Sequence, residues 1–181
     1  MPVSPDTLPR MTPEEYLAYE HSQEIRHELV DGYLYAMTGA SRRHEEIALN
    51  LAAALHAHLR GKPCRAYKGD LKIRVGADFH YPDVFVRCGE PAADGDPYAA
   101  SDPVLVAEVL SPSTQRYDRG DKRLACWSLP SMREYVLIAQ DRRHVEVTRL
   151  GEPESIVLTR DEDSLTLDSI GFSMALADLY E

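Results

Sequence analysis

The chain has few cysteines and no long apolar run. Its 181 residues include three widely spaced cysteines, Cys64, Cys88 and Cys126. They form no CxxC metal pair and predict no disulfide framework, so we expect a reducing, cytoplasmic setting. No apolar run approaches the roughly 18–20 residues that span a bilayer, so we expect no membrane association. The first residues lack the basic end and apolar stretch of a secretory signal.

Repeats and low-complexity linkers are also lacking. Hydrophobic residues make up 44% and charged residues 28% of the chain, an ordinary globular composition that excludes a disordered or fibrous protein. A chain of this length is typical of one domain. We therefore expect residues 1–181 to form a single domain.

The net charge of −10 speaks against a nucleic-acid partner. The charge is unevenly distributed, however, because residues 42–74 carry +5 and 111–149 carry +3, while 75–110 between them carry −6. One interpretation is an ordinary solvated surface. The other is an acidic metal site between cationic walls that hold a phosphate chain. Charge alone leaves both open.

Local signals predict the first elements. Thr12 and Glu15 form a capping box that begins a helix. Asp31-Gly32 between two alternating runs predicts a hairpin, because both turn residues tolerate positive φ. Ser41 caps a long helix whose apolar residues recur every four positions. These core positions are Ile47, Leu51, Leu55 and Leu59, with Gly61 just past the helix end.

The remaining chain is predicted to be strand-rich. The apolar run 104–110 indicates a central strand covered on both faces. A helix over 117–128 should direct Tyr117, Leu124 and Trp127 inward. Mixed strands and helices in this order indicate an α/β or α+β class with a mixed sheet. We also expect strands at 71–75, 81–86, 134–139, 144–150 and 155–158, a surface loop over 87–103 and a terminal helix at 174–179.

Glu108 is the unusual residue of the apolar run. A carboxylate among aliphatic residues is costly to bury unless a cation or hydrogen bonds compensate it. If the strand that follows Asp83 pairs antiparallel with this one, Asp83 and Glu108 lie side by side. Two such carboxylates are typical of a Mg²⁺ site, since Mg²⁺ takes its other ligands from water and phosphates. Alternatively, Asp83 is a turn residue after Pro82, and Glu108 points to solvent.

Hydroxyls and cations follow the apolar run. Residues 111–122 lead into a helix and could cradle a phosphate. Lys122 either faces the two carboxylates or forms a surface pair with Asp118 one turn away. Arg42, Arg43 and His44 begin the long helix, where an anion is also favoured, although a solvated helix end explains them better.

Over nearly its whole length the sequence resembles the Uma-two family of putative restriction endonucleases, in the PD-(D/E)XK nuclease superfamily. The order and spacing of five segments carry the resemblance. They are His27-Glu28-Leu29-Val30-Asp31-Gly32, Tyr81-Pro82-Asp83-Val84, residues 102–114 around Glu108, Tyr117-Asp118-Arg119-Gly120-Asp121-Lys122, and Arg133-Glu134-Tyr135-Val136.

The resemblance implies a restriction-endonuclease-like core, a mixed sheet flanked by helices, preceded by an N-terminal helix and hairpin. It implies a Mg²⁺-dependent DNA endonuclease, with Mn²⁺ as an alternative ion. Leu110 stands where the superfamily signature has lysine, and Lys122 is the candidate for that role. The implied catalytic residues are Asp83, Glu108, Lys122 and Glu28; the implied metal ligands are Asp83, Glu108 and the carbonyl of Val109; the implied phosphate contacts are Arg116, Arg119, Ser113 and Thr114.

Two other functions remain open at this stage. A catalytically silent module that binds nucleic acid or protein agrees with the acidic balance and with Leu110. A phosphodiesterase acting on RNA or small nucleotides needs fewer phosphate contacts. We also expect a homodimer, for which Tyr33 and Tyr35 of the hairpin are candidate interface residues.

Overall fold

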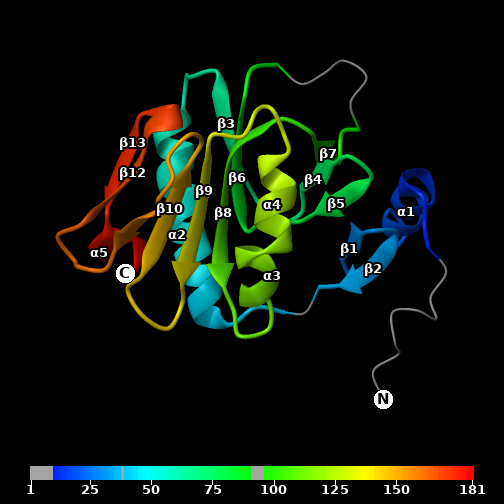
Figure 1. Cartoon of the computed structure of the whole chain (residues 1–181), viewed down its shortest axis with the longest axis horizontal. Helices are drawn as coiled ribbons and strands as arrows, with labels where there is room; N and C mark the ends of the chain where they lie inside the picture. The colour runs from blue at the N-terminus through cyan, green and yellow to red at the C-terminus, as the bar shows by residue number, and fades with distance from the viewer. Residues whose placement is uncertain (1–9, 38, 91–95) are drawn as a thin grey trace.

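A six-stranded mixed sheet forms the centre of the computed structural model, which describes residues 10–37, 39–90 and 96–181. The strand order is β11-β10-β9-β8-β6-β3, and β8 and β9 form its one parallel pair. The apolar run therefore lies in the middle of the sheet, as predicted (Figure 1). The strands are β3 (Cys64–Lys68), β6 (Val84–Cys88), β8 (Pro103–Leu110), β9 (Glu134–Ala139), β10 (Val145–Arg149) and β11 (Ile156–Leu158).

A second sheet follows the order β2-β1-β5-β4-β7 and carries helix α1 (Pro13–Glu20). The capping box is confirmed, because Thr12 and Glu15 exchange both hydrogen bonds. The hairpin is confirmed too, with φ of 51° at Asp31 and 83° at Gly32. The strands are β1 (His27–Val30), β2 (Tyr33–Ala36), β4 (Lys72–Val75), β5 (Asp78–His80) and β7 (Ala99–Ala100). Strand β7 lies within the segment predicted to be only a loop.

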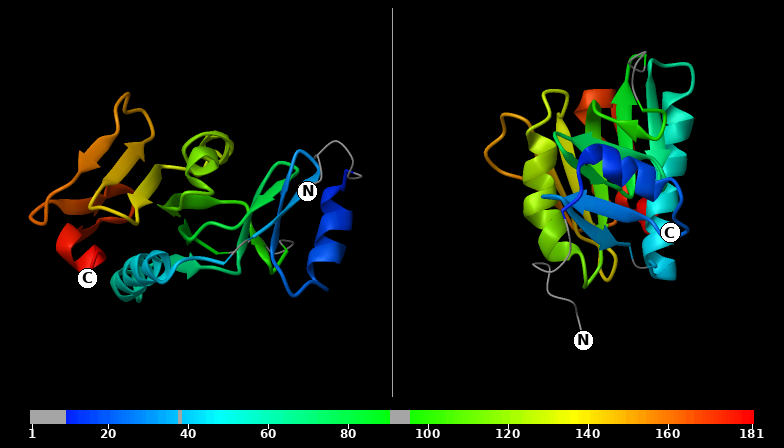
Figure 2. Two further views of the ribbon diagram at one scale, coloured as in Figure 1. Left: turned by 90° about the horizontal axis from the view of Figure 1, so that it is seen from below. Right: turned by 90° about the vertical axis from the view of Figure 1, so that its right-hand side faces the viewer.

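Helices cover both faces of the central sheet (Figure 2). Helix α2 (Arg42–Leu59) packs on one face, and its predicted stripe is buried. Strand β8 alternates: Leu105, Ala107 and Val109 join the core against α2, whereas Val106 and Leu110 join the core on the opposite face. Glu108 has the same parity as these last two and so faces the same way. This parity directs its carboxylate away from α2.

The helix predicted over 117–128 is divided at Gly120 into α3 (Gln115–Arg119) and α4 (Asp121–Trp127). A Cβ at Gly120 would lie 3.1 Å from the carbonyl oxygen of Arg116, so this close approach favours glycine. The buried residues of the two helices lie four positions apart, at Asp118, Lys122 and Cys126. The prediction for Leu124 is wrong, since it is 65% exposed, while Lys122 and Cys126 are buried.

The C-terminal segment packs along α2 from Arg43, which donates to the carbonyl of Tyr180, to His58, whose Nε2 contacts the carbonyl of Ile170. Its two-stranded sheet, β12 (Ser164–Leu167) and β13 (Phe172–Ala175), was not predicted, although both strands contribute to the core against α2. Between them lies the 3₁₀ helix η2 (Asp168–Ile170). The predicted terminal helix is confirmed as the shorter α5 (Leu176–Leu179). None of the helices in the described part combines the length and apolar character needed to cross a bilayer.

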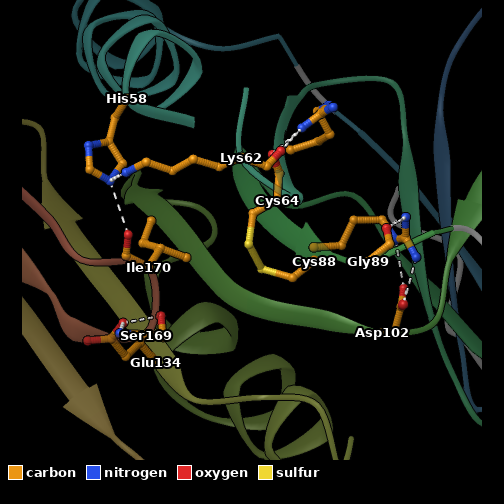
Figure 3. The surroundings of a disulfide bond; sticks show 11 residues. His58, Lys62, Cys64, Cys88, Gly89, Asp102, Glu134, Ser169 and Ile170 are labelled. Atoms are coloured by element: carbon orange, nitrogen blue, oxygen red, sulfur yellow. Dashed lines mark hydrogen bonds and ion pairs between the residues drawn. A yellow bond between two sulfur atoms is a disulfide. The ribbon is translucent and has the colours of Figure 1, made fainter. Parts of the chain in front are cut away.

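Cys64 and Cys88 form a disulfide between β3 and β6 (Figure 3). The two residues are register partners, and the N–H of Gly89 donates to the carbonyl of Pro63 beyond them, so they form a non-hydrogen-bonded pair. Side chains of such pairs lie closest together across an antiparallel ladder. The prediction that the cysteines form no disulfide is therefore wrong for this pair. Cys126 is free and buried.

Candidate active site

Asp83 and Glu108 lie side by side, as their flanking strands predicted. Val84 pairs with Ala107 in the antiparallel β6–β8 ladder, so the residue before β6 meets the residue after Ala107. The N–H of Asp83 donates to Glu108 Oε2 over 3.2 Å, and the N–H of Val109 donates to Asp83 Oδ2 over 2.7 Å. Each carboxylate thus accepts a backbone N–H from the segment that carries the other carboxylate.

Lys122 reaches these carboxylates from the first turn of α4. Its Nζ lies 2.9 Å from Glu108 Oε1 and 3.1 Å from Glu28 Oε1, and it donates to the carbonyl of Tyr81. The alternative of an exposed pair with Asp118 is not what the structure contains, because the Lys122 side chain is only 5% exposed. Burial alone lowers the pKa of Lys122, but Glu108 and Glu28 raise it well above its usual value. The side chain is therefore an ammonium at neutral pH.

Glu28 joins the group from β1 of the second sheet. Its Oε1 also accepts the N–H of Tyr81 over 2.8 Å, and its Oε2 lies 3.8 Å from His80 Nδ1. Burial raises the pKa of Glu28, but Lys122 and His80 lower it more, to about 2. Glu28 is consequently the firmly ionised partner of Lys122.

The pKa of Glu108 is shifted in the opposite direction, upward. Burial raises its pKa, and although Lys122 lowers it, Asp118 and Asp83 raise it further, so that it stays well above the ordinary value. Its Oε1 is buried in ion-pair contact with Lys122 Nζ over 2.9 Å. The raised pKa means that this position favours a proton or another cation beside the carboxyl group of Glu108.

His44 contacts Asp83, a relationship that the sequence analysis missed. Its Nε2 lies 2.9 Å from Asp83 Oδ1, and its Nδ1 is buried without a hydrogen-bond partner in the described chain. Burial alone lowers the pKa of His44, but the hydrogen bond and charge of Asp83 raise it overall. The signal was present in the spacing, since His44 precedes Ala48, Leu51 and Leu55 on the buried stripe of α2.

The predicted phosphate contacts lie in and after the loop that follows β8. Ser113 and Thr114 are exposed, and their hydroxyls each lie 2.9 Å from Ser111 Oγ. Arg116 is exposed and forms no ion pair with described residues. Arg119 is already engaged, because its Nη1 donates to both carboxylate oxygens of Glu146 over 2.7 and 2.8 Å.

The donor set fits a hard cation that brings most of its own ligands. No three His, Cys, Asp or Glu side chains in the described part converge to hold a metal ion. Asp83 and Glu108 nevertheless supply adjacent carboxylates, and Asp83 is 24% exposed. Mg²⁺ commonly uses one or two carboxylates and completes its shell with water and phosphate oxygens, which agrees with this pair.

The fold is that of a solved nuclease-like structure. The crystal structure of a putative nuclease belonging to DUF820 from Anabaena variabilis ATCC 29413 superposes with a TM-score of 0.80, covering 94% of this chain and 97% of that chain. Sequence identity is 19%, so the similarity establishes the shared fold. The restriction-endonuclease-like, mixed α/β architecture expected from the sequence is therefore confirmed.

Residues 13–177 match the family Uma2, described as "Putative restriction endonuclease". The chain belongs to this family, as its motifs indicated. Two proteins of Synechocystis sp. (strain ATCC 27184 / PCC 6803 / Kazusa) are similar to it. Uncharacterized protein slr1290 is 36% identical over 96% of this chain and 93% of its own length, and uncharacterized protein sll1609 is 30% identical over 75% and 78%.

Proposed function

We propose that this chain is a Mg²⁺-dependent endonuclease that hydrolyses phosphodiester bonds in DNA, with Mn²⁺ as an alternative ion. The observation that carries the proposal is the convergence of Asp83, Glu108 and Lys122 at one end of the β6–β8 pair. A buried lysine held between carboxylates is costly to assemble, and such groups are typical of catalytic sites. Membership of the Uma2 family supports the same class of reaction.

In this proposal Asp83, Glu108 and the carbonyl of Val109 hold the cation, beside the Val109 N–H that fixes Asp83. When bound, Mg²⁺ supplies an activated water and a counter-charge for the transition state. Lys122 is an ammonium and so does not accept a proton; it orients the attacking water and offsets developing negative charge. Glu28 keeps the Lys122 side chain in place and charged.

The phosphate contacts are assigned to the loop after β8. Arg116 and the hydroxyls of Ser113 and Thr114 are exposed there and available to phosphate oxygens flanking the scissile bond. Arg119 can contact a phosphate only if it releases Glu146.

DNA is the proposed partner, and a two-fold homodimer, which suits cleavage of both strands, is part of the proposal. Size-exclusion chromatography with light scattering measures the dimer.

A cleavage assay tests the function. Plasmid, linear duplex, single-stranded DNA and RNA are incubated with Mg²⁺, Mn²⁺ or a chelator, using the wild type and Glu108→Gln. Metal-dependent cleavage that falls at least ~100-fold in the variant is expected. Glu154→Gln is the matched control, since Glu154 is exposed.

Three results would contradict the proposal. Undiminished cleavage by Glu108→Gln would show that Glu108 is not part of the catalytic site. An absence of cleavage on every substrate favours the silent binding module, and cleavage of RNA alone favours the RNA phosphodiesterase. Thermal unfolding of each variant separates loss of chemistry from loss of fold.

A further inference from the structure

A pocket of about 400 Å³ opens at the carboxyl ends of β8 and β9. Leu110, Pro112 and Ala139 give it an apolar wall, and Gln115 and Gln140 contribute amides. Its volume lies in the range of pockets that enclose one small organic ligand. A lining of apolar side chains and amides, together with the charged Arg119, Asp141 and Arg142, suits a flat ring with polar edges.

The pocket adjoins the proposed active site by two short connections. Leu110 directly follows Val109, whose N–H holds Asp83. On the other side, Ser41 lines the pocket and its Oγ accepts the N–H of His44, which in turn contacts Asp83. The pocket and the carboxylates are therefore connected through β8 and through the start of α2.

The polar groups of the pocket differ in availability. Gln140 is occupied, because it donates to the carbonyl of Leu110 and accepts from Ser41. The side chain of Gln115 is exposed at the start of α3 and makes no hydrogen bond with the described residues. Gln115 is thus the amide that can exchange donors and acceptors with the edge of a base.

The cationic side chains around the pocket suit contact with a short stretch of nucleic-acid backbone. Arg119 pairs with Glu146, Arg142 with Asp141, and Arg143 with Asp161. Arg42 and Arg116 are the exposed arginines nearby, at the starts of α2 and α3, that pair with no carboxylate in the described chain. Affinity for duplex DNA depends on many phosphate contacts. Two arginines unpaired in the described chain are too few to supply them.

We propose that this pocket binds one unpaired nucleotide of DNA beside the scissile phosphate, so that the site prefers DNA with an unpaired nucleotide over continuous duplex. The inference rests on the proposed nuclease function and names its substrate class. A base stacked in a duplex enters such a pocket only after unstacking, and that cost is smallest for a base already unpaired. Stacking of the base on apolar side chains and hydrogen bonding to Gln115 then replace phosphate contacts.

Two DNAs test the inference: a duplex, and the same duplex with a single bulged 2-aminopurine nucleotide. Binding is measured by anisotropy with Ca²⁺, and insertion of the base by 2-aminopurine fluorescence. We expect wild type to bind and, with Mg²⁺, to cleave the bulged DNA about tenfold better. Gln115→Ala should abolish this preference, whereas Gln23→Ala, the control in the segment between α1 and β1, should keep it.

The outcomes separate the two proposals. Equal cleavage of both DNAs, or a preference unchanged by Gln115→Ala, overturns the pocket assignment and leaves the nuclease function standing. Preferential binding of the bulged DNA with a fluorescence change, but no cleavage, supports the pocket and counts against the nuclease function. Failure to bind or cleave either DNA overturns both.

Discussion

The ammonium of Lys122 lies 2.9 Å from Oε1 of Glu108, and both side chains are at most 5% exposed. The contact joins the first turn of α4 to the middle of the sheet. It gives the buried carboxylate of Glu108 a cationic partner that comes from another element of the fold.

Removing the ammonium should cost both stability and activity. Lys122→Met leaves Glu28 and Glu108 buried without their cation, and breaking a buried pair costs about 3–5 kcal/mol. We expect urea unfolding to show this loss and cleavage to fall at least ~100-fold. Lys122→Arg should restore little of the stability or the cleavage, because a planar guanidinium does not fit the volume of an ammonium. Wild-type stability in Lys122→Met would refute the buried ion pair.

Glu28 should make stability depend on pH in the acid range. Its pKa is lowered from 4.5 to about 2, so its contribution is complete above about pH 4.5 and lost as the pH falls toward 2, amounting to at most about 3 kcal/mol. Unfolding free energies at pH 5 and 3 measure it. Glu28→Gln should show a smaller difference between the two pH values than wild type. Equal differences in both proteins would contradict the shift.

His44 should support the metal affinity of Asp83. Groups that orient a metal-binding carboxylate commonly change metal affinity by about 10–100-fold when removed. We expect His44→Ala to weaken Mn²⁺ binding, measured by calorimetry, by roughly tenfold. His56→Ala is the control, since His56 lies on the same helix and is exposed. Unchanged Mn²⁺ affinity in His44→Ala would separate His44 from the site.

Gly120 should be needed for the division between α3 and α4. A methyl group there meets the carbonyl oxygen of Arg116 at 3.1 Å, so Gly120→Ala should destabilise the fold by about 1–3 kcal/mol. Gly39→Ala is the control, because a Cβ at Gly39 has no neighbour within 4 Å. Cleavage should fall with Gly120→Ala because Lys122 lies in the first turn of the following helix. A fully stable and active variant would refute this role.

The disulfide should stabilise the pairing of β3 with β6. Cys64 and Cys88 are 24 residues apart, and closing a loop of this length contributes about 3 kcal/mol in the chain-entropy account. A reductant should therefore lower the urea midpoint of wild type. The double variant Cys64→Ser, Cys88→Ser should be insensitive to reductant. A similar response of both proteins would mean that the bond contributes nothing to stability.

Short-range patterns alone determined much of the framework. The Thr12 capping box, the Asp31-Gly32 turn and the stripe of α2 involve residues one to four positions apart, whose geometry the local backbone fixes. The apolar run around Glu108 also identified the central strand. A lone carboxylate in such a run marked the site because burying it requires a partner.

Only the tertiary structure decided which partners these residues meet. His44 is 39 residues from Asp83, and the cysteine pair is 24 residues apart, so both contacts depend on strand order and register. Lys122 reaches Glu108 because α4 packs on the face of the sheet toward which Glu108 points, and the sequence pattern had left the direction of Lys122 open. Periodicity specifies a face of each element, but packing of the elements determines what that face contacts.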